Sequence, residues 1–184
     1  QGREQKNQKR CDSRGIGKAE NKSKLAQKDI DADWTKKNGE RHFGYKDHVK
    51  CDADSKLITN YSVTSASVHD SQRCLVFIGQ EDEVLYADSA YSGKPIALAL
   101  PENCKNQICE KGYRNSPLTS EQKMNNRRKS RIRCRIEQIF GFMTGAMHGI
   151  TIRSIGITRA WMNIGITNLV YNFCRYSYLK RASA

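Results

Sequence analysis

The strongest periodic pattern in the chain lies in residues 127–143, RRKSRIRCRIEQIFGFM. Wound as a helix, this stretch places its large apolar residues on one stripe at the 3.6-residue period: Ile132, Ile136, Ile139, Phe140 and Met143. Its single carboxylate, Glu137, falls beside that stripe and follows a run of cations. On this stretch alone, the favoured interpretation is an ordinary i, i+4 ion pair between Arg133 and Glu137 on a solvated face.

Shorter patterns precede this helix. Loose alternation over residues 42–52 and β-rich residues over 56–64, separated by a turn at 53–55, predict a β-hairpin. We expect a helix from Ser67 or Asp70 to Ile78, with either residue as its cap. Residues 84–87 read as a short buried strand, residues 95–100 as a helix with proline in its first turn, and residues 106–110 as another strand.

Two longer helices complete the expected elements. The Glu137 helix is predicted to start near Thr119, and a basic loop bounded by glycines follows it at 149–156. A second amphipathic helix is expected from Ile157 to Lys180, with its apolar side formed by Trp161, Ile164, Leu169 and Phe173. Strands that alternate with helices after an antiparallel hairpin predict an α/β layer with a mixed sheet.

Composition indicates the number of domains and the character of the N-terminal segment. The chain has 184 residues and 38% hydrophobic residues, which favours one domain over residues 30–184. Residues 1–29 hold nine Lys and Arg against four Asp and Glu, so they are expected to form a basic flexible arm or loop. No apolar run approaches the roughly 20 residues of a membrane span, so no membrane partner is expected. The absence of an initiator Met suggests the interior of a longer protein.

Charge and cysteine content point to a partner and a compartment. The formal net charge of +13 favours an anionic partner, with nucleic acid as the first candidate. Seven scattered cysteines without a CxxC pair argue against a zinc site and favour free thiols in a reducing cytoplasm.

A second carboxylate gives Glu137 a chemical context. Asp88 follows the predicted 84–87 strand, and ligands of open α/β sheets collect at the carboxyl ends of strands. Carboxylates from separate elements inside a basic surface are what Mg²⁺-dependent phosphodiester chemistry requires. The competing interpretation of Asp88 is an Asx turn or a helix cap after the strand, and the residues alone leave both open.

Several motifs in a fixed order support a family resemblance. They are QKDIDADWTKK (27–37), GYKDHV (44–49) with Asp52, ASVHDS (66–71), ADSAY (87–91), RIRCRIEQIFG (131–141), IGITRA (155–160) and NLVYN (168–172). Together they resemble the DDE-type transposases of the IS5/IS4 insertion-sequence group. The resemblance covers roughly residues 27 to 176, and the joint order and spacing of the short motifs make it specific.

The resemblance implies an RNase H-like mixed β-sheet flanked by helices and lacking its first strand. It makes Asp88 the second and Glu137 the third catalytic acid, both binding Mg²⁺ or Mn²⁺, and places the first acid upstream of Gln1. The expected DNA contacts are Arg127, Arg128, Lys129, Arg131 and Arg133. Lys46 and His48 on the hairpin are further candidates, with a solvated strand face as the alternative. The implied activity is strand cleavage and strand transfer at transposon ends, by a homo-oligomer in a bacterial cytoplasm.

Two alternatives remain at this stage. One is a catalytically inactive, nucleic-acid-binding remnant of a transposase, since one of three acids is not found in the chain. The other is a different RNase H-like nuclease, whose first acid would lie within the chain. Asp70 is a minor candidate for an acid, because capping its own helix is the simpler role.

Overall fold

The computed structural model describes residues 27–37 and 39–183. Asp31–Ala184 forms one compact unit. The predicted basic arm over residues 1–29 lies almost entirely outside the described residues. All of the elements below belong to the compact unit.

A three-stranded antiparallel sheet forms the centre of the unit. It contains β1 (Asp33–Lys37), β2 (Glu40–Cys51) and β3 (Ile58–Ser65) in the order β1-β2-β3. The register opposes Asp47 to Val63 and Val49 to Tyr61. The predicted hairpin is therefore confirmed, and β1 adds a strand to it.

The alternation along β2 sends its side chains to two different environments. Tyr45, Val49 and Cys51 pack with the long helices described below. On the opposite face, the ammonium group of Lys50 forms a 2.6 Å ion pair with Asp82. The central sheet is thus covered by apolar contacts on one side and bounded by polar contacts on the other.

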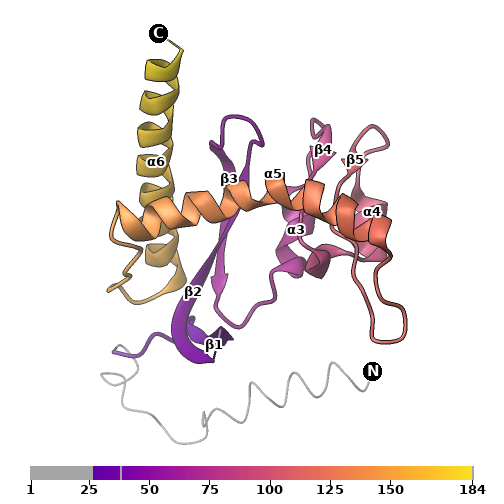
Figure 1. The fold of residues 1–184 in the computed structure, drawn as a ribbon. Coiled ribbons are helices and arrows are strands. Elements are labelled where there is room, and N and C mark those ends of the chain that lie inside the picture. The colour runs from indigo at the N-terminus through magenta and orange to yellow at the C-terminus, as the bar shows by residue number, and fades with distance from the viewer. Residues whose placement is uncertain (1–26, 38, 184) are drawn as a thin grey trace, which may run out of the picture. The chain divides into compact units, whose positions relative to one another are not determined.

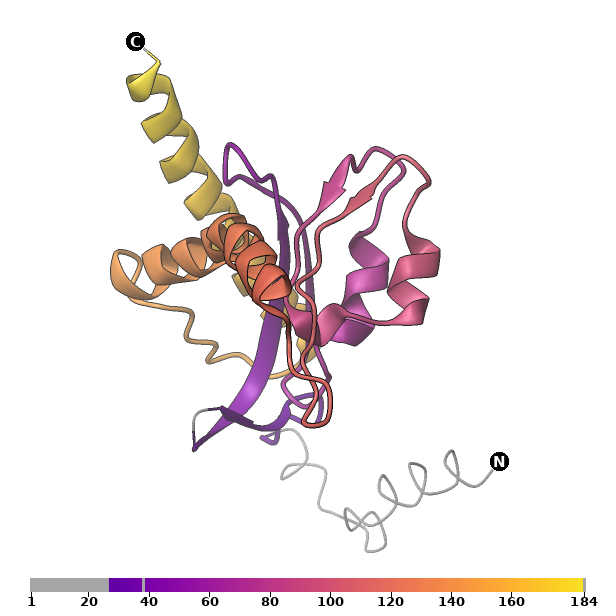
Figure 2. The same ribbon diagram turned by 45° about the vertical axis from the view of Figure 1, so that its right-hand side comes forward.

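A strand–helix–strand unit follows the hairpin (Figure 2). It comprises α3 (Ser71–Phe77), β4 (Val84–Leu85), the 3₁₀ turn η1 (Ser89–Tyr91), α4 (Lys94–Ala99) and β5 (Lys105–Asn106). β4 and β5 pair in parallel, and backbone hydrogen bonds continue the ladder to the amide of Cys109 and the carbonyl of Ala87 at 3.0 Å. Cys74, Ile96 and Ile108 form its small core.

Helix α5 (Ser120–Gly145) runs across from this unit toward the last helix (Figure 1). It begins with a capping box in which Thr119 and Gln122 satisfy each other's backbone amides. From the predicted apolar stripe, Ile139 and Met143 are fully buried against Ile58. The helix predicted from periodicity is confirmed.

Helix α6 (Ile157–Ala182) corrects one part of the sequence prediction. It buries Ile164, but Leu169 and Phe173 of the predicted apolar side are 54% and 63% exposed. The buried face is formed instead by Ala160, Ile164, Asn168 and Tyr171. Because apolar residues occupy opposite sides of this helix, the pattern did not show which side is buried.

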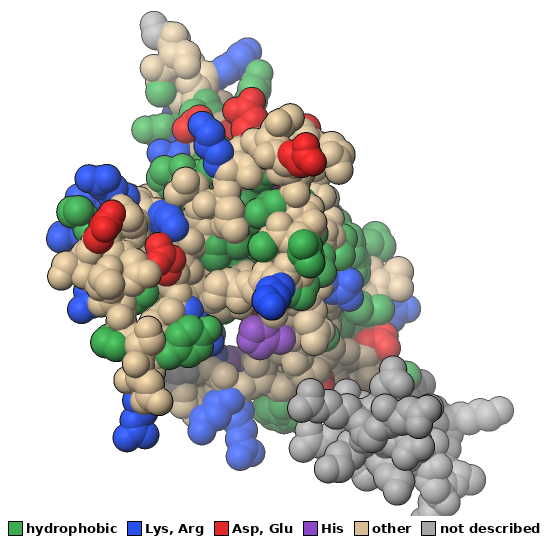
Figure 3. Space-filling view, turned by 90° about the vertical axis from the view of Figure 1, so that its right-hand side faces the viewer, with side chains coloured by type: hydrophobic (Ala, Val, Ile, Leu, Met, Phe, Trp, Pro, Cys, Tyr) green, Lys and Arg blue, Asp and Glu red, His purple; other side chains and the backbone are tan. Residues whose placement is uncertain are grey.

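The predicted α/β layer is thus present, with its antiparallel and parallel strand pairs in two small sheets instead of one mixed sheet. Among the described residues, no helix is long and apolar enough to cross a membrane. On the face that carries α4, β4 and β5, hydrophobic side chains reach the surface between charged ones (Figure 3). Leu98 of α4 is 86% exposed.

Candidate active site

Asp88 lies where the parallel β4–β5 ladder ends. The carbonyl of Ala87 accepts the last ladder hydrogen bond, from Cys109, and Asp88 follows directly. Its side chain is exposed, and its Oδ1 accepts a 2.6 Å hydrogen bond from the Ser89 amide at the start of η1. The predicted cap is therefore confirmed, and Asp88 follows the end of the ladder, while its role as a metal ligand stays a prediction.

Glu137 lies on the surface of α5. Its Oε1 forms a 3.0 Å ion pair with Nη2 of Arg133, and its side chain is 62% exposed. The predicted i, i+4 pair is confirmed. A solvent-exposed pair of this kind adds little to stability, so the pair leaves the carboxylate accessible to another ligand.

Polar contacts fix the first half of α5 at the carboxyl end of β5. The side chain of Asn126 accepts a 2.9 Å hydrogen bond from the Glu110 amide and donates a 3.0 Å bond to the Glu110 carbonyl. Nζ of Lys129 donates to the Ile108 carbonyl at 3.0 Å. Sγ of Cys109 lies 3.8 Å from Oγ of Ser130.

These contacts relate the two carboxylates. Ser130 and Glu137 are seven residues apart and share one side of the helix, at a separation of about 10 Å along its axis. Ser130 contacts Cys109, whose amide is bonded to the residue before Asp88. Asp88 and Glu137 therefore belong to elements that meet at the same end of the β4–β5 ladder.

The oxygen atoms of the two carboxylates are of the type that binds a hard divalent cation. Carboxylate oxygens are what Mg²⁺ prefers, and Asp88 and Glu137 are both accessible. Within the part of the chain that the structure describes, no group of three or more His, Cys, Asp or Glu is placed to hold a metal ion. The described residues thus contain two accessible carboxylates near the ladder end and not a complete ligand set.

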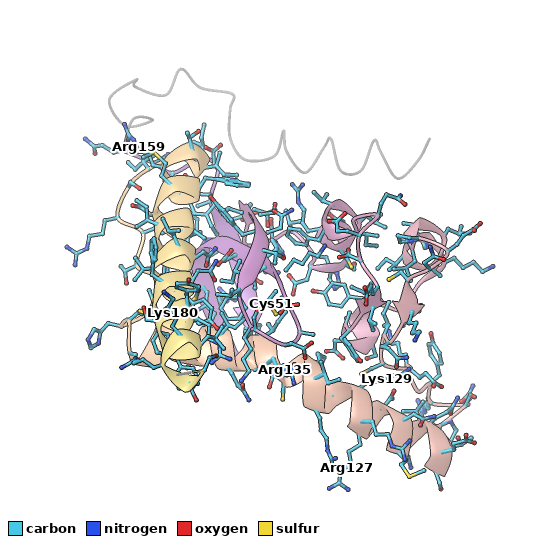
Figure 4. All side chains as sticks on the ribbon, turned by 90° about the horizontal axis from the view of Figure 1, so that it is seen from above. Cys51, Arg127, Lys129, Arg135, Arg159 and Lys180 are labelled. Atoms are coloured by element: carbon cyan, nitrogen blue, oxygen red, sulfur yellow. The ribbon has the colours of Figure 1, made fainter. Side chains whose placement is uncertain are left out.

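The cations of α5 divide into two groups. Arg127, Arg128 and Arg131 are exposed, and Figure 4 shows Arg127 pointing away from the sheets. Lys129, by contrast, is bonded to the Ile108 carbonyl after β5, and Arg133 is paired with Glu137. The three exposed arginines are therefore accessible to a phosphate backbone. Lys129 instead anchors the helix, and Arg133 pairs with Glu137.

Lys46 and His48, the two hairpin residues predicted to contact DNA, make hydrogen bonds within the protein instead. The His48 side chain is only 8% exposed, its Nε2 lies 2.8 Å from Oγ1 of Thr64, and burial lowers its pKa. Nζ of Lys46 donates to the Val68 carbonyl at 2.9 Å and to Asp70 at 3.2 Å. The structure thus places His48 in the interior, because its strand position faces the segment before α3 and not solvent.

Asp70 also differs from expectation. It occupies the N-cap position of α3, but its side chain makes no capping hydrogen bond. Its Oδ1 is instead bonded to Lys46 and lies 3.9 Å from Nδ1 of His48. Asp70 therefore ties α3 to the central sheet.

A buried polar pair was not singled out from the sequence. Nδ2 of Asn168 on α6 donates to Oδ1 of Asp47 on β2 at 3.4 Å. The other two oxygens, Oδ2 of Asp47 and Oδ1 of Asn168, are buried without a hydrogen-bond partner among the described residues. Burial raises the pKa of Asp47 to about 6. The available signal was the strand alternation, which puts Asp47 on the same face as Tyr45 and Val49.

Comparison with known proteins identifies the family. A family model described as the transposase DDE domain matches residues 11–173. The chain belongs to the DDE-domain transposase family. It is also similar to the transposase for insertion sequence element IS1106 from Neisseria meningitidis serogroup B, with 34% identity over 117 residues. That match covers 62% of this chain and 40% of the relative, so the chain spans less than half of the relative's length. No solved structure matches.

Membership of the DDE-domain family confirms two of the sequence predictions. The resemblance to an insertion-sequence DDE transposase is confirmed, while the narrower IS5/IS4 group stays a prediction. The small sheet flanked by helices is consistent with the RNase H-like fold expected for this family.

Proposed function

We propose that the chain is the catalytic DDE domain of an insertion-sequence transposase, which cleaves DNA strands at transposon ends and joins them to target DNA. One observation carries this proposal. Asp88 ends a parallel ladder, and the helix that carries Glu137 is hydrogen-bonded to that same ladder. Two accessible acids on adjoining elements, beside exposed arginines, suit a phosphodiester substrate.

The residues of this chain have distinct parts in the proposed reaction. Asp88 and Glu137 would hold Mg²⁺ or Mn²⁺, together with the first acid that the family resemblance implies. When bound, such ions activate the attacking oxygen and stabilise the leaving one. Arg133 forms a 3.0 Å ion pair with the Glu137 carboxylate, which stays accessible.

The exposed arginines provide the DNA contact. Arg127, Arg128 and Arg131 lie on the same helix as Glu137 and are exposed. The guanidinium group binds phosphate oxygens in pairs, so these side chains would position the backbone near the acids without reading sequence. The substrate is DNA at the terminal inverted repeats and at the target, in a bacterial cytoplasm.

A non-catalytic DNA-binding remnant is the second candidate. It is favoured by the observation that the described residues contain no group of three metal ligands. Such a remnant would keep the arginines and the salt-sensitive binding but would not need Asp88 or Glu137.

Strand cleavage on terminal inverted repeats separates the two candidates. In the full-length transposase, where the first acid is supplied, we expect Mg²⁺-dependent cleavage that falls by about 100-fold or more in Asp88→Asn and in Glu137→Gln. The matched controls are Asp54→Asn, which changes a fully exposed aspartate, and Glu121→Gln at the start of α5. Undiminished cleavage in Glu137→Gln contradicts its role. Salt-sensitive DNA binding without any cleavage supports the remnant.

A further inference from the structure

Helix α6 has apolar side chains on two opposite sides. One side is buried against the sheet and α5 through Ala160, Ile164, Asn168 and Tyr171. The other side carries five large, mostly exposed residues, which we call the outer stripe. They are Met162 at 64% exposure, Ile166 at 57%, Leu169 at 54%, Phe173 at 63% and Tyr176 at 52%.

The spacing of the outer stripe is regular. Its residues follow one another at intervals of four, three, four and three, which is the a/d repeat of a coiled-coil seam. At about 100° per residue, the stripe lies about 150° around the helix from the buried side. The stripe is therefore a continuous seam on the solvent side, not a scatter of single exposed residues.

Charge favours a second copy of the chain as the occupant. Residues 160–174 contain no charged side chain, although the chain has a formal net charge of +13. Two strongly basic chains can approach closely only where neither presents a cation. DNA finds no cation to bind along this stretch, so the stripe does not suit the nucleic-acid partner.

The exposed area is close to what a symmetric contact needs. With roughly 200 Å² for each large side chain, the five residues expose on the order of 600 Å² per copy. That value is at the upper end of the patches seen on monomers and approaches the roughly 800 Å² that each partner buries in a standard interface.

The residues at the two ends of the outer stripe favour an antiparallel over a parallel pairing of two α6 helices. Arg159 and Lys180 lie toward opposite ends of α6 (Figure 4) and continue the seam at both ends. A parallel pair would set each of these cations against its own copy, which is unfavourable. An antiparallel pair would instead set Ile166 against Leu169, Met162 against Phe173, and Arg159 against Tyr176.

We propose that the outer stripe of α6 is a self-association surface that packs antiparallel against the same stripe of a second copy, with Ile166 and Leu169 at its centre. The contact is isologous, because each residue pair occurs twice about a twofold axis. The proposed active-site acids, Asp88 at the start of η1 and Glu137 on α5, take no part in it.

Sedimentation over a concentration series tests the surface. The chain is expected to form dimers, and Leu169→Glu is expected to weaken dimerisation by about tenfold or more. Leu98→Glu is the matched control, because it makes the same change at a leucine that is 86% exposed on α4. A circular dichroism spectrum and an unfolding midpoint equal to those of the parent show that Leu169→Glu remains folded.

Cysteine cross-linking tests the direction, in a background where the exposed Cys174 is replaced by serine. Met162→Cys and Phe173→Cys should each fail to cross-link alone and should link when the two variants are mixed. Efficient linking of Met162→Cys with itself indicates a parallel pair and overturns the antiparallel arrangement. A chain that stays monomeric, or that binds lipid vesicles through the stripe without dimerising, overturns the proposal.

Discussion

Replacing Asp47 by asparagine should stabilise the protein at neutral pH. Asp47 and Asn168 share one hydrogen bond, and one oxygen of each is buried without a partner among the described residues. An asparagine at position 47 keeps an acceptor for Asn168 and adds an NH₂ group that can donate to the orphaned Oδ1 of Asn168. The change therefore removes a buried charge and satisfies an oxygen at the same time.

The magnitude follows from the pKa of Asp47, which burial raises from 3.8 to about 6. A difference of about two pKa units corresponds to about 3 kcal/mol at most, and partial solvent access reduces it to about 1–3 kcal/mol. The sign follows from linkage. Since the folded-state pKa lies above the unfolded value, the stability of the parent falls as pH rises from about 4 through about 6. The asparagine side chain does not titrate, so the advantage of the Asp47→Asn variant grows over that window and is complete above it.

Urea unfolding at pH 4 and pH 8 measures this difference. Asp47→Asn should gain about 1–3 kcal/mol over the parent at pH 8 and little at pH 4. Asp54→Asn is the control, because it makes the same substitution at a fully exposed residue and should show no comparable pH-dependent gain. A variant that is no more stable than the parent at pH 8, or whose gain is equal at both pH values, refutes this reasoning.

Three further predictions concern α5. Ile139→Ala should lower the unfolding free energy in urea by about 2–5 kcal/mol, because Ile139 is fully buried, whereas the exposed Met124→Ala should change it little. Asn126→Ala should cost about 1–3 kcal/mol, because it removes both bonds to the end of β5, and an unchanged unfolding midpoint would contradict that anchoring role. Arg131→Ala should reduce the salt slope of DNA binding by about one, while Lys180→Ala on α6 should leave that slope unchanged.

Much of the fold could be predicted from local pattern. The β2–β3 hairpin, the proline at the start of α4, and the capping box of α5 are short-range features, so the residues that define them are adjacent in sequence. Helix α6 shows where this fails. Its length was predicted, but Leu169 and Phe173 were assigned to the buried side, because only tertiary packing distinguishes two apolar sides of one helix.

In the candidate site, too, some features could be predicted from local sequence, and others depend on tertiary contacts. Asp88 could be located from its position after a strand, and Glu137 from the family resemblance. Their relation depends on Asn126 and Lys129, which join α5 to β5 through backbone groups and carry no sequence signature of that role. The inward position of His48 likewise depends on Thr64 of the neighbouring strand, and not on the residues beside it.

Asp88 and Glu137 are proposed to belong to one metal-binding site. Titration of Mn²⁺ followed by electron paramagnetic resonance tests it without requiring activity, using the parent, Asp88→Asn, Glu137→Gln and the double variant. If the acids share a site, each single substitution should weaken Mn²⁺ binding by about tenfold or more. The double variant should then lose less binding free energy than the sum of the two single losses. Binding that is unchanged by either substitution, or losses that add independently, would contradict a shared site.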